Sequence, residues 1–216
     1  MEAKLIIKNQ RQYFQTRATR NIKMLKGRLI KLRVEILKRE DAIYEALYKD
    51  FKKSKFETYF SEIGIVISEI DATLKHINTW SKAKKVRASG LNFPSRDYIY
   101  SEPYGCVLVI APWNYPFQLA IAPVISAIAA GNTVVLKPSE HTRHTSQLLD
   151  DILRAVFPTE HLTVIQGGVQ ETTLKRALGL YLFHWQCSCW ENCCQSSSAF
   201  LNATDPRTRR KKPLYH

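Results

Sequence analysis

The 216-residue sequence contains no long apolar run and no amino-terminal leader pattern. A membrane helix needs roughly 20 consecutive apolar residues. The most apolar stretch, residues 117–130, is shorter than that and contains Pro123, so we interpret it as a buried crossover helix. The first four residues, Met-Glu-Ala-Lys, lack the apolar segment of a signal peptide. We therefore expect a cytoplasmic protein without a membrane segment.

Cysteine is scarce and unevenly distributed. There are five cysteines, and four of them lie in the segment CSCWENCC at residues 187–194. A metal-binding or disulfide-bonded cluster is one interpretation of this segment, but because its spacing matches no common zinc pattern, we expect no metal site. The fifth, Cys106, lies in an apolar run and is interpreted as a small buried hydrophobic residue.

Acidic residues are outnumbered, and the formal net charge is +13. A basic module that binds nucleic acid through the amino-terminal helices is therefore one alternative. However, the basic residues are spread over the first 96 positions and alternate with acids at helical spacing, as in Glu35, Lys38, Arg39 and Glu45. Such a pattern is typical of solvated helix faces. Since no RNA-binding motif or zinc-finger spacing accompanies the charge, we expect no nucleic-acid partner.

The chain divides into three stretches. Residues 1–96 predict a helical segment followed by a loop at 86–96, because apolar residues recur with a period near 3.6. The stripes are Leu25, Leu29, Leu32, Ile36; Ile43, Leu47, Phe51; and Ile63, Ile67, Ile70, Leu74, Ile77. Residues 97–173 predict strands at 98–101, 107–110, 133–136 and 162–166, with helices at 117–130 and 142–157. This alternation indicates an α/β fold whose parallel sheet is covered by helices on both faces.

Polar side chains follow two of the predicted strands. The run 107–110 leads into PWNYP (112–116), which presents Asn114, and the run 133–136 ends in Lys137 and Glu140. Open α/β sheets bind ligands at the carboxyl ends of their strands. The motifs PWNYP and GNTVVLKPSE (131–140) together resemble the aldehyde dehydrogenase superfamily, in particular its class 3-like branch. The resemblance implies the first half of a Rossmann-like nucleotide-binding domain, which here is truncated.

The resemblance implies a reaction and a set of site residues. Intact family members oxidise an aldehyde to a carboxylic acid through a thiohemiacetal and a thioester, use NAD or NADP, and form homodimers. A neutral amide suits an oxyanion, and Asn114 matches the residue with that role, although Asn is also a common turn former. Lys137 and Glu140 match the residues that hold the adenosine ribose; the alternative is a surface ion pair, which would contribute little.

Other positions are assigned to the same cleft. Pro112, Trp113 and Ser139 are expected to line the cofactor cleft, and Tyr115 to face the aldehyde tunnel or to belong to the core. No G-x-G-x-x-G fingerprint follows any strand. Gly167 and Gly168 are therefore candidates for a close approach to a phosphate, or for an ordinary turn. The family's catalytic N-x-G-Q-x-C and E-L-G-G-K segments are both absent, so we expect this fragment itself to be inactive.

The last stretch, residues 174–216, loses all periodicity. When synonymous codons are read one base out of register, residues 179–191 can yield DYIFFTGSVAVGK and residues 206–216 can yield LELGGKSPCI, which are the family's next two motifs in order. We therefore interpret the tail as out of frame, from a one-base deletion or a sequencing error near the codon of Leu174, and expect it to be disordered. The competing interpretation is a short interaction protein that acquired a basic, Cys-rich tail.

Overall fold

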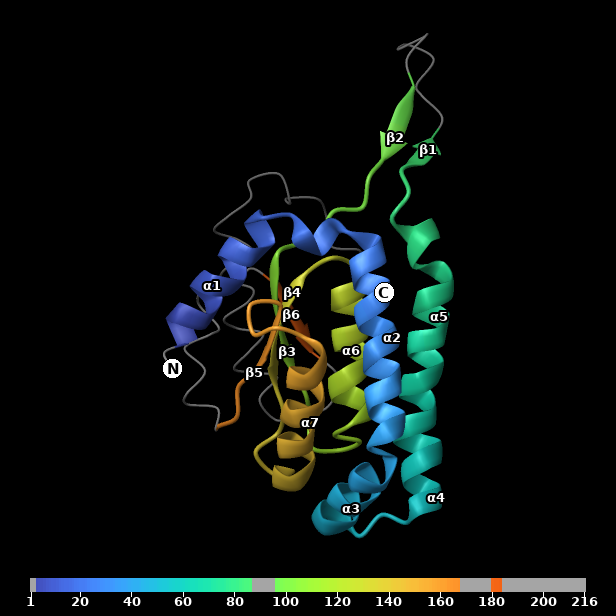
Figure 1. The fold of residues 1–216 in the computed structure, drawn as a ribbon, viewed down its shortest axis with the longest axis vertical. Helices are drawn as coiled ribbons and strands as arrows, with labels where there is room; N and C mark the ends of the chain where they lie inside the picture. Colours follow the sequence, from blue (N-terminus) through green and yellow to red (C-terminus); the bar gives the residue numbers. More distant parts are fainter. Residues whose placement is uncertain (1–2, 87–95, 168–179, 184–216) are drawn as a thin grey trace, which may run out of the picture. The chain divides into compact units, whose positions relative to one another are not determined.

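The computed structural model describes residues 3–86, 96–167 and 180–183. The amino-terminal part is helical: α1 (Ala3–Gln15), a short 3-10 turn (Ala18–Arg20), α2 (Ile22–Lys38), α3 (Glu40–Phe51), α4 (Lys55–Thr58), the π-helical segment η2 (Tyr59–Ile63) and α5 (Gly64–Trp80). Figure 1 shows α2 and α5 running side by side next to α6. The helical prediction for this part of the chain is confirmed.

Local sequence explains where these helices begin. The side chain of Asn21 accepts a hydrogen bond from the Met24 amide (3.2 Å) at the start of α2, and Ser54 accepts one from Glu57 (3.2 Å) at the start of α4. Such caps satisfy amides that have no partner within the helix. The predicted apolar stripe of α2 is buried as a unit: Leu25, Leu29, Leu32 and Ile36 are each at most 2% exposed. Its burial against α5, α6 and α7 joins the helical segment to the sheet region.

The sheet comprises four parallel strands in the order β5-β4-β3-β6. They are β3 (Cys106–Ile110), β4 (Thr133–Lys137), β5 (Leu162–Val164) and β6 (Leu180–Phe183), and the crossover helices are α6 (Gln118–Ala129) and α7 (Arg143–Val156). The predicted strands and helices of this region therefore exist, with ends that differ by a residue or two. When these four strands are numbered along the chain, the order is 3-2-1-4, which is one half of a dinucleotide-binding sheet (3-2-1) and the first strand of the other half.

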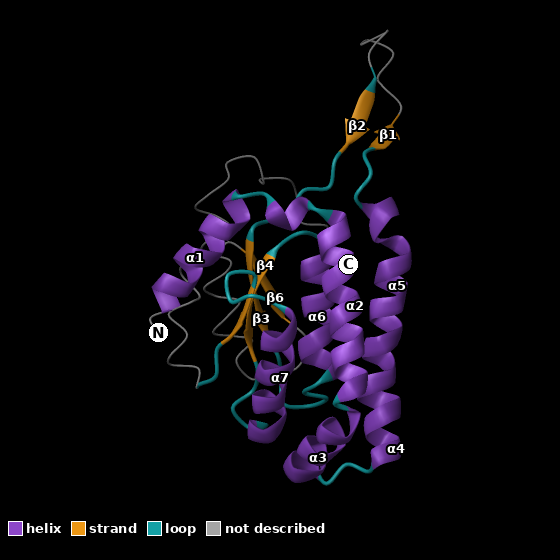
Figure 2. Ribbon diagram, viewed as in Figure 1, coloured by secondary structure: helices purple, strands orange, loops and turns teal. Residues whose placement is uncertain are grey.

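Helices cover both faces of this sheet, as predicted (Figure 2). Side chains alternate between faces along a strand: Val107 and Val109 belong to the large core shared with α2, α5, α6 and α7, whereas Leu108 packs with Ile6 and Ile7 of α1. Buried Gln10 of α1 donates a hydrogen bond to the Val134 carbonyl (2.8 Å). The cover on the second face thus comes from the amino terminus rather than from a crossover helix.

Two expectations need correction. The strand predicted at 98–101 is β2 (Asp97–Ile99), which pairs antiparallel with β1 (Lys84–Val86) in a separate two-stranded sheet and does not join the parallel sheet. Most of the loop expected at 86–96 lies outside the described residues. Disorder was expected from residue 174 onward, but residues 180–183 form β6, which pairs in parallel with β3. The rest of that stretch lies outside the described residues.

Candidate functional site

The carboxyl ends of β3 and β4 meet at one edge of the sheet. Ile110 is paired with Lys137, and the Ala111 amide continues the ladder by donating to the Lys137 carbonyl at 3.0 Å. β3 lies between β4 and β6, so the chain reverses its direction of travel across the sheet at β3. Ligands of open α/β sheets bind outside the strand ends at this point of reversal. The fold therefore brings the two predicted polar motifs to the position where a ligand site is expected.

Lys137 and Glu140 form an ion pair at this edge. The Lys137 Nζ lies 2.9 Å from Glu140 Oε2, and the side chains are 6% and 38% exposed. Partial burial raises the pKa of Glu140, but the hydrogen bond and charge of Lys137 outweigh it and hold that pKa below its ordinary value. The pair therefore differs from a fully exposed surface pair: its cation is buried, and its carboxylate is ionised and accessible.

Asn114 lies in the turn between β3 and α6. Its side-chain oxygen Oδ1 is buried and has no hydrogen-bond partner among the residues that the structure describes. An Asn that forms a turn uses this oxygen to bind nearby backbone amides. Asn114 Oδ1 makes no such hydrogen bond within the described residues. A buried acceptor without a partner calls for a physical explanation, and a donor on a bound ligand or water that reaches Oδ1 is one.

The residues on either side of Asn114 are exposed aromatics. Trp113 is 50% exposed and its ring stacks on Phe51 at 6.5 Å between centroids. Tyr115 is 44% exposed, so it does not belong to the core, and its φ of 50° is left-handed. That conformation costs a non-glycine residue about 1–2 kcal/mol. Strained backbone of this kind persists only where surrounding contacts hold it.

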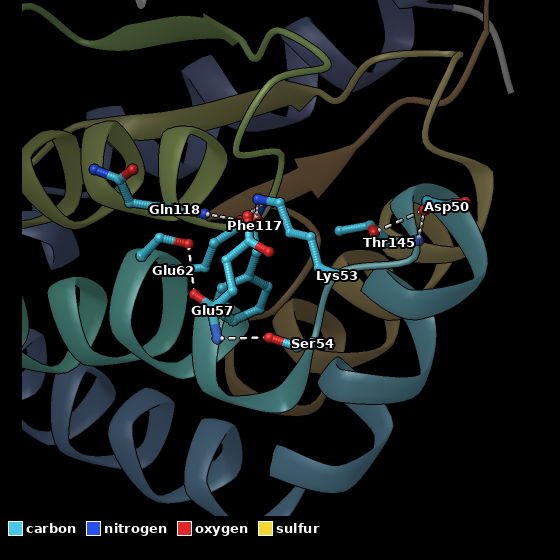
Figure 3. A network of polar contacts seen from close by, with 9 residues as sticks. Asp50, Lys53, Ser54, Glu57, Glu62, Phe117, Gln118 and Thr145 are labelled. Atoms are coloured by element: carbon cyan, nitrogen blue, oxygen red, sulfur yellow. Dashed lines mark hydrogen bonds and ion pairs between the residues drawn. The ribbon is translucent and has the colours of Figure 1, made fainter.

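Residues of the amino-terminal part of the chain contact the start of α6, just after this turn, as Figure 3 shows. Glu62 of η2 is fully buried, and its Oε2 accepts hydrogen bonds from the amides of Phe117 (2.8 Å) and Gln118 (3.2 Å), where α6 begins. Its Oε1 lies 2.5 Å from the Nζ of Lys53. A carboxylate suits the positive end of a helix. Many dinucleotide-binding folds bind phosphate at the amino terminus of the first crossover helix. In this chain that helix is α6, and the Glu62 carboxylate already binds the amides at its start.

A second acid, Asp50, caps the other crossover helix, α7. Asp50 Oδ2 accepts hydrogen bonds from the Thr145 amide (2.8 Å) and hydroxyl (2.7 Å), and Oδ1 from the His144 amide (3.3 Å), at the start of α7. Neither crossover helix has a cap from its own N-cap residue. The sequence reasoning missed both acids. A signal existed for Glu62, because it falls four residues before Val66 on the apolar stripe of α5, where a carboxylate needs buried partners.

The remaining predicted residues have different settings. Pro112 is buried. Ser139 is also buried; its hydroxyl accepts a hydrogen bond from the His141 amide (3.3 Å), and its carbonyl accepts from Thr142 and Ser146. Its hydroxyl thus helps to shape the turn between β4 and α7. Gly167 has φ 140°, a left-handed value that favours glycine. Gly168 lies outside the described residues, as does the Cys-rich segment 187–194.

The part of the chain that the structure describes has neither a helix that could cross a membrane nor a cluster that could bind a metal ion. None of its helices combines the length and apolar character needed to cross a membrane. The same residues, 3–86, 96–167 and 180–183, contain no cluster of three or more His, Cys, Asp or Glu side chains that could hold a metal ion.

The sequence is similar to known aldehyde dehydrogenases over a region that includes both motifs. The profile of the aldehyde dehydrogenase family matches residues 1–177. The chain belongs to this family. It is 43% identical over 164 residues to the 4,4'-diaponeurosporen-aldehyde dehydrogenase of Staphylococcus aureus, covering 76% of this chain and 36% of that protein. It is 39% identical to aldehyde dehydrogenase family 3 member A2 of Pongo abelii, covering 78% of this chain and 35% of that one. The resemblance to the class 3 branch is confirmed.

Solved aldehyde dehydrogenases share the architecture. The substrate-bound state of Staphylococcus aureus AldH superposes with a TM-score of 0.86 at 36% identity, covering 93% of this chain and 44% of that chain. The NADP+ complex of a Streptococcus pyogenes succinic semialdehyde dehydrogenase has the same fold, with a TM-score of 0.80 at 14% identity and coverage of 91% of this chain and 43% of that one. Aldehyde dehydrogenases use NAD or NADP. The chain spans only about a third of the length of the relatives it matches in sequence.

Proposed function

We propose that this chain contains, up to about residue 174, the part of an NAD(P)-dependent aldehyde dehydrogenase that holds the adenosine ribose and supplies the oxyanion donor. Lys137 and Glu140 bind the two ribose hydroxyls, the first as donor and the second as acceptor. The Asn114 carboxamide donates a hydrogen bond from Nδ2 to the oxygen of the aldehyde as negative charge develops there. Bound NAD(P) supplies the acceptor for the hydride. The chain lacks the family's nucleophilic cysteine and its catalytic glutamate, so by itself it does not oxidise aldehydes.

One observation supports this proposal above the others. The Lys137–Glu140 pair, at 2.9 Å, follows β4 directly beside the strand that carries Asn114, at the carboxyl edge of the sheet. A ribose diol needs one donor and one acceptor a few ångströms apart. The pair has both, and Glu140 is exposed enough for a ligand to reach it. The residues present therefore fit the nucleotide that the family uses.

Nucleotide titration tests the binding half of the proposal. Calorimetric titration of the full chain with NAD+ and with NADP+ is expected to show binding that Lys137→Met and Glu140→Gln each weaken. Hydrogen bonds to charged groups contribute roughly 1.5–3 kcal/mol, so the expected loss is about 10- to 100-fold. The control substitutions are Lys49→Met and Glu45→Gln, because these residues form an exposed ion pair of the same chemistry. Equal affinity in all five proteins would refute the ribose assignment.

Activity is tested separately. The purified chain, given either nucleotide and an aliphatic or an aromatic aldehyde, is expected to produce no reduced nucleotide. Production above an enzyme-free blank, abolished by Asn114→Ala, would overturn the claim that the fragment is inactive.

We also propose that the tail is translated out of frame after about residue 174. The family match ends at residue 177, close to the point where the sequence loses its periodicity. The shifted reading places Tyr-Ile-Phe-Phe at residues 180–183, where the chain has Leu-Tyr-Leu-Phe. Both readings are apolar, which suits the strand position of β6. Resequencing the coding DNA tests this: the idea fails if no single-base change near the codon of Leu174 restores FTGS and ELGGK.

A further inference from the structure

We propose that Glu62 and Lys53 are positioning residues that set the conformation of the turn carrying Asn114. This inference rests on the proposed role of Asn114, but it concerns how the turn is held. The two residues lie 52 and 61 positions before Asn114 in the sequence, in the segment between α3 and α5. They reach the turn from outside the nucleotide-binding sheet, so nothing in the PWNYP motif itself reveals them.

The carboxylate fixes the carboxyl-terminal side of the turn. Glu62 is 0% exposed and accepts from two successive amides, those of Phe117 and Gln118, at 2.8 and 3.2 Å. Phe117 is the N-cap residue of α6 and Gln118 is its first residue, so neither amide has a partner within that helix. Because one oxygen binds both, it determines where α6 begins and in which direction the turn enters it. Asn114 lies only three residues before Phe117, so a shift of that start moves its side chain.

The ammonium group holds the aromatic neighbours of Asn114. The Nζ of Lys53 lies 4.3 Å from the centroid of the Tyr115 ring and 6.0 Å from that of Phe51. Phe51 in turn stacks on Trp113. Cations bind the faces of aromatic rings in this distance range. The residues on both sides of Asn114 are therefore held by the segment 51–53, one directly and one through a ring contact.

The charge arrangement makes the two residues one unit. The Lys53 side chain is 12% exposed and lies 2.5 Å from the fully buried Glu62 carboxylate. A buried carboxylate is stable only when its oxygens are paired and hydrogen-bonded. Lys53 neutralises Oε1 while the α6 amides occupy Oε2, so each partner keeps the other in place. The left-handed Tyr115, with φ 50°, is the strained residue that this unit stabilises.

Asp50 provides a matched control. It caps α7 with three hydrogen bonds, just as Glu62 caps α6, but α7 carries no member of the Asn114 turn. Glu62→Gln and Asp50→Asn remove one charge each and keep the side-chain volume. If capping were only a matter of stability, the two substitutions would affect the Asn114 turn alike.

The experiment is heteronuclear NMR of the full chain labelled with 15N. The side-chain amide of Asn114 is identified by its absence in Asn114→Asp. Glu62→Gln and Lys53→Met are expected to shift or broaden this signal and the indole signal of Trp113. Asp50→Asn is expected to perturb the amides at the start of α7 and leave both signals unchanged. The proposal is overturned if Glu62→Gln leaves the Asn114 signal at its wild-type position, or if Asp50→Asn displaces it equally.

Wild-type hydrogen exchange covers the case in which the variants do not fold. The amides of Phe117 and Gln118 are expected to exchange as slowly as those in the middle of α6, although amides in a first helical turn normally exchange fast. Fast exchange at both positions would overturn the proposal. Nucleotide titration of Lys137→Met remains a separate test: loss of the proposed ribose site would leave these NMR outcomes unaffected, and the reverse also holds.

Discussion

Mild acid should weaken the folding of this chain through one buried imidazole. His161 is 0% exposed, and its Nε2 lies 3.2 Å from the Asn132 carbonyl oxygen, to which it must donate. Its Nδ1 lies 2.6 Å from Nη1 of Arg28 and must accept. The folded protein therefore holds the neutral ring. Burial, followed by the positive charge of Arg28, lowers the pKa of His161 from 6.5 to about 3.

The direction and size of the effect follow from linkage. The folded-state pKa is depressed, so the stability that the neutral ring provides is complete above pH 6.5 and is lost as the pH falls towards about 3. Between pH 6.5 and about 3, His161 binds a proton in the unfolded chain but not in the folded chain. One pKa unit corresponds to about 1.4 kcal/mol. At pH 5 the expected loss is therefore about 2 kcal/mol relative to neutral pH, a large share of a typical net stability.

The assay is urea unfolding of the full chain at pH 7 and pH 5, compared with His161→Gln. Glutamine places an amide where Nε2 lies and does not titrate in this range, so this variant is expected to be less stable at pH 7 but to lose about 2 kcal/mol less on acidification. His76→Gln is the control, since His76 is exposed. The reasoning is refuted if wild type and His161→Gln lose equal stability between the two pH values.

Three further outcomes are expected. Lys53→Met should lower the unfolding free energy by about 3–5 kcal/mol, because it leaves the buried Glu62 carboxylate without its cation; a loss no larger than that of the exposed-pair control Lys49→Met would contradict this. Gly131→Ala should cost about 1–2 kcal/mol, because φ is +85° and a Cβ would lie 3.0 Å from the Thr19 carbonyl oxygen. Gly27→Ala should instead stabilise by about 0.5–1 kcal/mol, since nothing lies within 4 Å of its Cβ position in α2. Denaturant midpoints measure all three.

The strands and helices of the parallel sheet were the easiest features to predict. The runs at 106–110 and 133–137 are short, apolar and bounded by glycine or proline, and each forms a buried strand close to its predicted limits. The ribbon of β1 and β2 was not predicted as such, because its strands have three residues each, carry charges and are mostly exposed. Because β1 and β2 have so few apolar positions, neither strand can be predicted from its own sequence; each is defined by its pairing with the other.

The candidate site was predicted only in part, for a related reason. Asn114, Lys137 and Glu140 follow apolar runs directly, so the rule for strand ends locates them. Glu62 and Asp50 lie on helical segments far away in the sequence, and they bind backbone amides, which have no sequence signature. Lys53 lies in the loop between α3 and α4, and its contacts are the Glu62 carboxylate and the Tyr115 ring. Predicting their roles requires knowing which helix end lies opposite each side chain.

The sequence by itself determined that this chain is an α/β protein with helices, a parallel sheet and polar groups at two strand ends, because periodicity and strand-end residues are local properties of the chain. Only the tertiary structure decided that the Lys137 ammonium is buried, that Asn114 Oδ1 has no hydrogen-bond partner among the described residues, and that the distant Glu62 carboxylate binds the amides at the start of α6. The reason is physical: burial and hydrogen-bond pairing depend on which segments meet in space, and the segments that meet here are more than fifty residues apart.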